Sequence, residues 1–176
     1  MVRKKGGSFV KQAAILAFAG IMVRVFGFLY RIPMTNMIGD TGNAIYSAGY
    51  YIYTFLLILS SAGLPAAISK MVSERLAVGE YRNAHKVFRV SLFVSGSLGF
   101  VCMVLMFVFA EQIATVLAES PESYYCILTL SPTLFIVAIM SVYRGYFQGM
   151  NTMLPTALSQ IVEQIFNAFF SVYLAY

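Results

Sequence analysis

Charged side chains are scarce in this sequence. Asp, Glu, Lys and Arg make up 11% of the 176 residues, whereas soluble domains carry roughly 25%. Hydrophobic residues make up 60%, and the mean hydropathy is +0.78. A chain of this composition cannot cover a water-facing surface in the usual way, which excludes an ordinary soluble domain. Lipid is therefore the expected solvent for most of the molecule.

Cysteine and histidine are almost absent, which argues against a metal centre. Cys102 and Cys126 lie inside apolar runs without metal-ligand spacing, and two cysteines make no disulfide framework. His85, the single histidine, sits in a charged segment and is expected to be solvated. The sequence also shows no Ser–His–Asp arrangement and no phosphate-binding glycine loop. We therefore expect no catalytic residue, no metal and no cofactor, and predict that the chain is not an enzyme.

The net charge of +5 does not indicate nucleic acid binding. The basic residues cluster in short segments between apolar blocks, where membrane topology requires them. Arg3, Lys4 and Lys5 precede an apolar run over 13–23, but no cleavage site ends this run. We therefore expect an uncleaved first membrane helix rather than a signal peptide.

Five stretches are long and apolar enough for membrane-crossing helices, each of which needs ~20 residues. They span residues 12–37, 45–69, 88–110, 124–143 and 156–176. They predict an all-α integral membrane protein, in which residues 1–176 form a single transmembrane unit with a five-helix bundle.

Basic residues alternate from one connection to the next. The connections 38–44 and 111–123 contain no Lys or Arg, whereas 70–87 is rich in both and 144–155 begins with Arg144. Because cytoplasmic connections carry the excess of Lys and Arg, the N-terminus and the latter two connections are expected in the cytoplasm. Five crossings then place Tyr176 on the outer side of the membrane.

The segment 70–87 alternates charged and apolar residues. This pattern predicts short amphipathic helices on the inner leaflet, broken at Gly79, with an ordinary solvated loop as the alternative. In the next span, Ser91, Ser95 and Gly99 recur every four residues, which predicts close approach of a neighbouring helix. Two prolines, at positions 65 and 132, are expected to interrupt or kink the helices that contain them.

Two arginines, Arg24 and Arg31, stand within the first span. They are nearly two turns apart and therefore share a helix face with Gly20 and Gly27. A charge against lipid tails costs at least ~2.5–3.5 kcal/mol on insertion scales, so this cationic strip is expected to face a hydrated cavity. The planar guanidinium suits phosphate oxygens. The alternative is a structural salt bridge, or snorkelling of Arg31 to the outer interface.

The last span carries a continuous polar face. Its members follow one another at intervals of four, three, four and four residues: Thr156, Gln160, Glu163, Asn167 and Ser171. Lipid would not tolerate such a face, so it is expected to line a cavity or pack on polar partners. Glu163 would pair with Arg24 or accept a coupling cation. A plain interhelical hydrogen-bond seam is the alternative.

Several segments together resemble a known family. They are RVFGFLYRIP over 24–33, SAGLPAAISK over 61–70, GEYRNA over 79–84, and YRGYFQGM over 143–150 with its continuation through 155–164. The chain resembles lipid-linked oligosaccharide flippases of the MOP exporter superfamily, in particular the MurJ-type and stage V sporulation protein B-like polysaccharide biosynthesis proteins. The likeness covers nearly the whole chain in order.

This resemblance implies a bacterial plasma-membrane protein that moves an undecaprenyl-pyrophosphate-linked saccharide, such as lipid II, across the bilayer. It implies a partial N-terminal lobe of a larger MATE/MOP-like fold, with the missing C-terminal half as a partner. Arg24 and Arg31 would bind the pyrophosphate, and Gln160, Glu163 and Asn167 would line the cavity. Two alternatives stay open: a MATE-type multidrug exporter, and a non-transporting remnant or membrane scaffold. Cationic drugs favour acidic cavities, which argues against the exporter.

Overall fold

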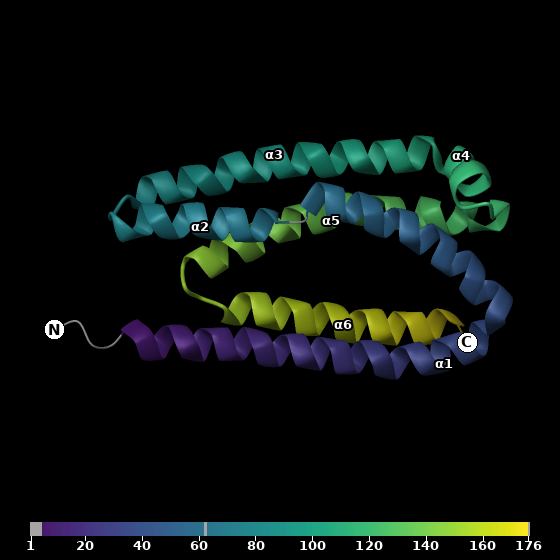
Figure 1. The fold of residues 1–176 in the computed structure, drawn as a ribbon, viewed down its shortest axis with the longest axis horizontal. Helices are drawn as coiled ribbons and strands as arrows, with labels where there is room; N and C mark the ends of the chain where they lie inside the picture. Colours follow the sequence, from purple (N-terminus) through teal and green to yellow (C-terminus); the bar gives the residue numbers. More distant parts are fainter. Residues whose placement is uncertain (1–4, 62, 176) are drawn as a thin grey trace. The chain divides into compact units, whose positions relative to one another are not determined.

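The computed structural model describes residues 5–61 and 63–175, and these residues are almost entirely helical. The elements in chain order are α1 (Lys5–Ser61), α2 (Leu64–Ala77), α3 (Tyr81–Val108), α4 (Ala110–Gln112), the π-helix η1 (Ile113–Leu117), the 3₁₀-helix η2 (Pro121–Ser123), α5 (Tyr124–Gly149) and α6 (Leu154–Ala175) (Figure 1). No strand occurs among the described residues. The predicted all-α fold is thus confirmed.

Three stretches within the described residues are long and apolar enough to cross a membrane. They are Gln12–Ala77, Tyr81–Val108 and Pro121–Gly149. The first is 66 residues long, and because a crossing takes ~20 residues, it has the length for two. The fifth predicted span corresponds to α6, which is not among the three because its polar face lowers its mean hydropathy. The chain is a membrane protein, and five crossings stay a prediction.

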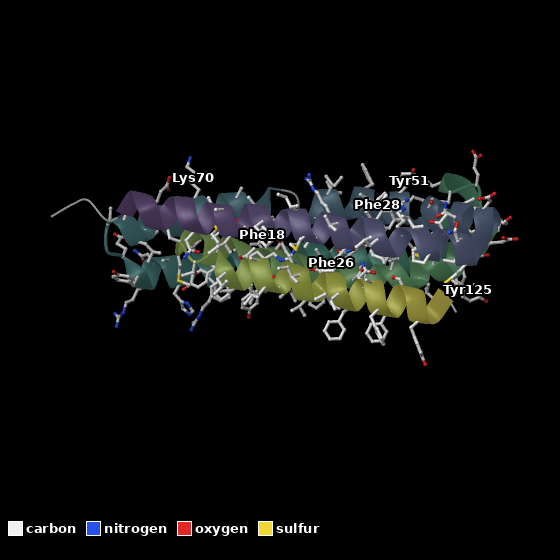
Figure 2. The ribbon with its side chains drawn as sticks, turned by 90° about the horizontal axis from the view of Figure 1, so that it is seen from below. Phe18, Phe26, Phe28, Tyr51, Lys70 and Tyr125 are labelled. Carbon is white, nitrogen blue, oxygen red and sulfur yellow. The ribbon has the colours of Figure 1, made fainter. Side chains whose placement is uncertain are left out.

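Large apolar side chains project outward along these helices. Phe18 and Phe28 on the first part of α1 are exposed, as are Tyr51 on its second part and Tyr125 on α5 (Figure 2). Exposed aromatic side chains in such number would be unfavourable in water and are favourable in acyl chains. Lipid or further helices are the expected surroundings of these faces.

A single glycine bends α1. Gly39 has φ 74° and ψ 178°, a conformation outside the helical region, while the residues on either side stay helical. Without a Cβ, glycine adopts this conformation, which other residues almost never do. The structure therefore has a kink at one residue where we expected a seven-residue connection over 38–44.

A second break separates α1 from α2. The helix ends at Ser61, Gly63 has φ 78°, and Pro65 occupies the first turn of α2. Proline suits this position because its missing N–H would have no partner in a first turn. The helix that we expected over 45–69 therefore ends before Pro65. By contrast, α5 continues through Pro132 as one element.

The expected break at Gly79 is confirmed. This residue has φ 78° and separates α2 from α3. The segment 70–87 is thus the end of one helix and the start of another. Its placement on the inner leaflet stays a prediction.

The chain divides into two compact units. One consists of Met1–Asp40 with Met150–Tyr176, and the other of Thr41–Gly149. In the second unit the expected row of small residues packs α3 on α5. Ser95 Oγ donates a hydrogen bond to the main-chain oxygen of Ala138 over 3.2 Å. A Cβ placed on Gly99 would lie 2.5 Å from the Cβ of Ala138. Helix α3 therefore approaches α5 closely because these positions are small.

The second unit also holds a hydrophobic core. It is formed by Tyr53, Cys102, Met106, Ala110, Ala114, Ile127 and Leu134. Ser123 Oγ donates a hydrogen bond to the main-chain oxygen of Ile45 over 2.8 Å and thereby joins η2 to α1.

Candidate functional site

The unit formed by Met1–Asp40 and Met150–Tyr176 contains every residue that we predicted as a binding site. Two lie on α1 and three on α6: Arg24, Arg31, Gln160, Glu163 and Asn167. Segments far apart in sequence are therefore joined in one compact body.

Within this unit, α1 and α6 lie side by side and run in the same direction (Figure 1). Near the start of both, the main-chain N–H of Met153 donates a hydrogen bond to Gln12 Oε1 over 2.9 Å. Further along, Gln164 Nε2 lies 3.3 Å from the position that a Cβ on Gly27 would occupy. The contacts advance together along the two helices, and Gly27 lets the Gln164 side chain lie against the α1 backbone.

The arginine strip flanks this contact. Arg24 is three residues before Gly27 and Arg31 four residues after it, so both lie within about 60° of Gly27 around the helix. Both arginines are exposed. Within the described part of the chain neither forms an ion pair. The expected pairing of Arg24 with Glu163 is thus absent from this structure.

The polar residues of α6 flank the same contact. Gln160 and Asn167 lie within about 60° of Gln164 around α6, and Glu163 lies on the same side. Asn167 Oδ1 accepts a hydrogen bond from Ser171 Oγ over 3.0 Å, and Glu163 is exposed. Arg24 is three residues before Gly27 on α1, and Gln160 and Glu163 are four residues and one residue before Gln164 on α6. Measured along the helices from the Gly27–Gln164 contact, Arg24 is therefore within about one turn of the height of both.

The other side of the helix pair is apolar. It contains a groove of about 540 Å³ lined by Phe26, Leu29, Tyr30, Pro33, Ala168, Phe169 and Tyr173. Around α1 the lining residues lie away from the arginines, and around α6 Phe169 and Tyr173 lie away from the carboxamides, whereas Ala168 lies one turn after Gln164. The pair of helices therefore has one side with cations and polar groups and one side that suits hydrocarbon.

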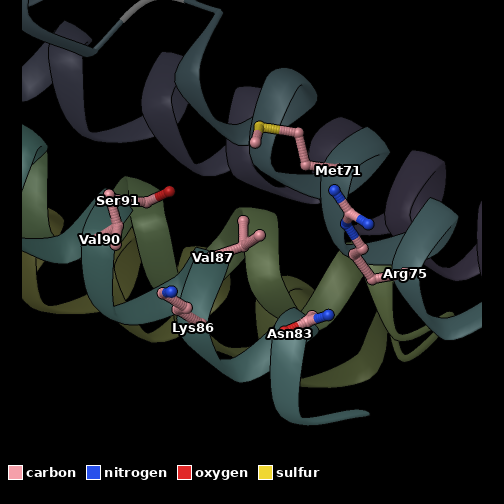
Figure 3. Close-up of a pocket in the computed structure, with 7 residues that line it drawn as sticks. All are labelled: Met71, Arg75, Asn83, Lys86, Val87, Val90 and Ser91. Carbon is pink, nitrogen blue, oxygen red and sulfur yellow. The ribbon is translucent and has the colours of Figure 1, made fainter. Parts of the chain in front are cut away.

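A second polar region lies in the other unit, which the sequence did not indicate as a site. A cavity of about 340 Å³ between α2 and α3 is lined by Met71, Arg75, Asn83, Lys86, Val87, Val90 and Ser91 (Figure 3). A shallower cavity of about 370 Å³ is lined by Tyr81, Arg82, His85, Lys86 and Arg89. A signal was available, because Arg82, Lys86 and Arg89 are spaced by four and three residues.

One carboxylate organises the edge of this region. Glu80 Oε2 accepts hydrogen bonds from Asn83 Nδ2 at 2.8 Å and from Arg75 Nη1 at 3.1 Å. The hydrogen bond from Asn83, followed by that from Arg75, holds the pKa of the exposed Glu80 carboxyl below its usual value near 4.5. The carboxylate also stands at the N-terminus of α3, where negative charge is favoured.

Metal-ligating side chains do not gather among the described residues, where no group of three or more His, Cys, Asp or Glu occurs. The arginine and lysine side chains of these two regions are able to form charged hydrogen bonds with anions, next to apolar walls.

Long apolar helices, outward aromatic side chains and cations on a membrane helix define an α-helical integral membrane protein. The chain belongs to the polysaccharide biosynthesis protein family, whose model matches residues 9–176. This confirms the family that the sequence segments indicate.

Individual relatives agree with this assignment. The chain is 35% identical over 158 residues to stage V sporulation protein B of Bacillus subtilis (strain 168), covering 90% of this chain and 30% of that protein. It is 34% identical over 164 residues to the lipid II flippase MurJ of the same organism, covering 89% and 30%. The chain thus spans under a third of the length of these relatives. No solved structure matches it at a significant level.

Proposed function

We propose that the chain takes part in moving an undecaprenyl-pyrophosphate-linked saccharide, such as lipid II, across the plasma membrane. The family match and the similarity to a lipid II flippase support this proposal. The observation that carries it is the exposed pair Arg24 and Arg31, in a stretch of α1 over 12–39 that has no other charged residue, beside the polar face of α6.

The proposed chemistry is capture of a diphosphate by two guanidinium groups. Each group is always charged and offers paired N–H donors that match phosphate oxygens. Seven residues correspond to about 10 Å along the helix, so a headgroup can pass from one arginine to the other as it crosses. With the N-terminus in the cytoplasm, Arg24 would be the inner contact and Arg31 the outer one.

The polar face of α6 would complete the site. Gln160 and Asn167 offer hydrogen bonds to sugar hydroxyls, and Glu163 adds one negative charge close to the arginine strip. That charge weakens the hold on a diphosphate and would favour its release, or would bind the coupling cation. The apolar groove on the other side of the pair would face hydrocarbon. The isoprenoid tail of the substrate would stay in this hydrocarbon while the diphosphate binds to the arginines.

Binding of undecaprenyl pyrophosphate to the chain in lipid nanodiscs tests the proposal. The variant Arg24→Gln/Arg31→Gln should bind at least tenfold more weakly, because each charged hydrogen bond contributes about 1.5–3 kcal/mol. Arg24→Lys/Arg31→Lys keeps the charge but loses the planar fork, and an intermediate affinity is expected. Transfer of fluorescent lipid II in proteoliposomes should follow the same order.

The matched control is Lys70→Gln, which removes an exposed cation from the other unit and should leave binding unchanged. Wild-type affinity in the double glutamine variant would contradict the proposal. A preference of the unaltered chain for a cationic dye such as ethidium would indicate a drug exporter instead, and binding of neither probe would favour a scaffold.

A further inference from the structure

The start of α3 presents a row of cations. Arg82, Lys86 and Arg89 are spaced by four and three residues, so they occupy one face over about two turns, and all three are exposed. Arg75 on α2 and Lys86 on α3 both line the cavity between these two helices (Figure 3). We call these four residues, with the cavities they line, the basic surface.

The basic surface carries two shallow, open cavities. The cavity between α2 and α3 and the one lined by the first turns of α3 measure about 340 and 370 Å³ and share Lys86. Volumes of this size are within the range of small-ligand sites, roughly 300–1,000 Å³. Among the described residues that line them, none is acidic.

Acidic neighbours do not cancel the positive charge. Glu80 is held by Arg75 and Asn83 at the edge of the surface, and this arrangement also fixes the position of the Arg75 guanidinium. Arg82, Lys86 and Arg89 form no ion pair with any described residue. Three cations are therefore available to an anion, and a fourth is oriented by its own carboxylate.

Apolar and aromatic groups border the cations. Met71, Val87 and Val90 form the apolar part of the inner cavity. At the same level of α3, the centroid of the Phe88 ring lies 4.7 Å from the ring centroid of Tyr146 and 5.2 Å from that of Tyr143, both on α5. Tyrosine rings beside cations are typical of the depth where lipid headgroups meet acyl chains.

We propose that the basic surface binds the phosphate of an anionic phospholipid of the inner leaflet. Lys86 lies between the two cavities and would contact the phosphate together with Arg75 or Arg89. The first methylenes of an acyl chain would lie on Met71 and Val90. A free phosphate would contact only the cations, whereas a phospholipid would contact the cations with its phosphate and the apolar walls with its acyl chains. The residues of this surface and those of the arginine strip on α1 belong to different units of the chain.

Native mass spectrometry of the purified chain, in micelles containing equal amounts of dioleoylphosphatidylglycerol and dioleoylphosphatidylcholine, tests the proposal. The unaltered chain should retain phosphatidylglycerol preferentially. The variant Arg82→Gln/Lys86→Gln/Arg89→Gln should lose at least tenfold of this preference, since each cation near an anionic surface contributes severalfold. Raising the salt concentration should weaken it as well.

A variant of equal net charge distinguishes a site from general attraction. Arg3→Gln/Lys4→Gln/Lys5→Gln also removes three cations but alters neither the basic surface nor the arginine strip, so its preference for phosphatidylglycerol should stay high. Equal losses in both variants would show that only total charge matters and would overturn the proposal. Displacement of the lipid by millimolar inorganic phosphate would also overturn it, because the site would then serve a soluble anion. Circular dichroism verifies that both variants keep their helices.

Discussion

Two glycines of α5 let α2 pack closely against it. A Cβ on Gly145 would lie 2.8 Å from the main-chain oxygen of Pro65 and 2.9 Å from its Cα. A Cβ on Gly149 would lie 2.7 Å from the Cβ of Val72. Backbone atoms cannot move aside as a flexible side chain can, so even one methyl group is too large at position 145.

Gly145→Ala is therefore expected to lower the free energy of unfolding by about 1–3 kcal/mol through overpacking. Thermal unfolding in detergent, followed by circular dichroism, measures the effect. Gly96→Ala is the matched control, because a Cβ there meets nothing within 4 Å. That change should be neutral or stabilising by up to about 1 kcal/mol, since alanine favours helix. Equal melting temperatures of the two variants would contradict the packing described.

The hydrogen bonds of Glu80 predict a dependence of stability on pH. The folded-state pKa of this carboxyl is lowered, so its contribution is fully present above the unfolded value near 4.5 and is lost as pH falls through the lower folded value. Glu80→Gln should therefore reduce the melting temperature at pH 7, and the difference from wild type should shrink below pH 4.5. A difference that is constant from pH 7 to pH 3 would assign the effect to something other than the charge.

At the scale of helices, glycine decides where the continuous apolar sequence bends. The long runs are enough to predict helices over most of the chain. They do not reveal that the connection expected over 38–44 is a kink at Gly39, or that the helix expected over 45–69 ends at Ser61. Several glycines in α1 stay helical, so composition alone does not distinguish a bend from an ordinary turn. The break at Gly79 was predictable because charged residues surround it.

The candidate site was predictable in its parts and not in its assembly. Spacing places Arg24 and Arg31 on one face, and likewise Gln160, Glu163 and Asn167. Which helix each face meets depends on packing between segments far apart in sequence. The contact of Gly27 with Gln164 supplies that information.

Gly39→Ala should be destabilising by about 1–3 kcal/mol. The backbone there has φ 74° and ψ 178°, a region that is strained for every residue with a Cβ. A Cβ at this position would meet nothing within 4 Å, so the loss would come from backbone strain alone. Gly20→Ala provides the comparison, because its site is equally open and its backbone is helical. A melting temperature for Gly39→Ala at or above that of Gly20→Ala would show that the kink is unimportant.

At the scale of the molecule, the predicted orientation places the α2–α3 connection and η2 on opposite sides of the membrane. Val78 is exposed at the first and Glu122 at the second. In a chain whose two native cysteines are replaced by alanine, Glu122→Cys should react with a membrane-impermeant maleimide on intact cells. Val78→Cys should react only after the membrane is opened. Labelling of both from the same side would refute the alternating arrangement.

The parallel pairing of α1 with α6 has a consequence for how the protein is made. The ribosome adds about 5–20 residues per second, so the first helix would wait roughly 7–27 seconds before its neighbour has been synthesised. During that interval Arg24 and Arg31 stand in the bilayer without the carboxamides of α6 beside them. A nascent chain in this state depends on the insertion machinery, or on locally thinned and hydrated lipid, to tolerate two permanent charges until translation reaches Gln164.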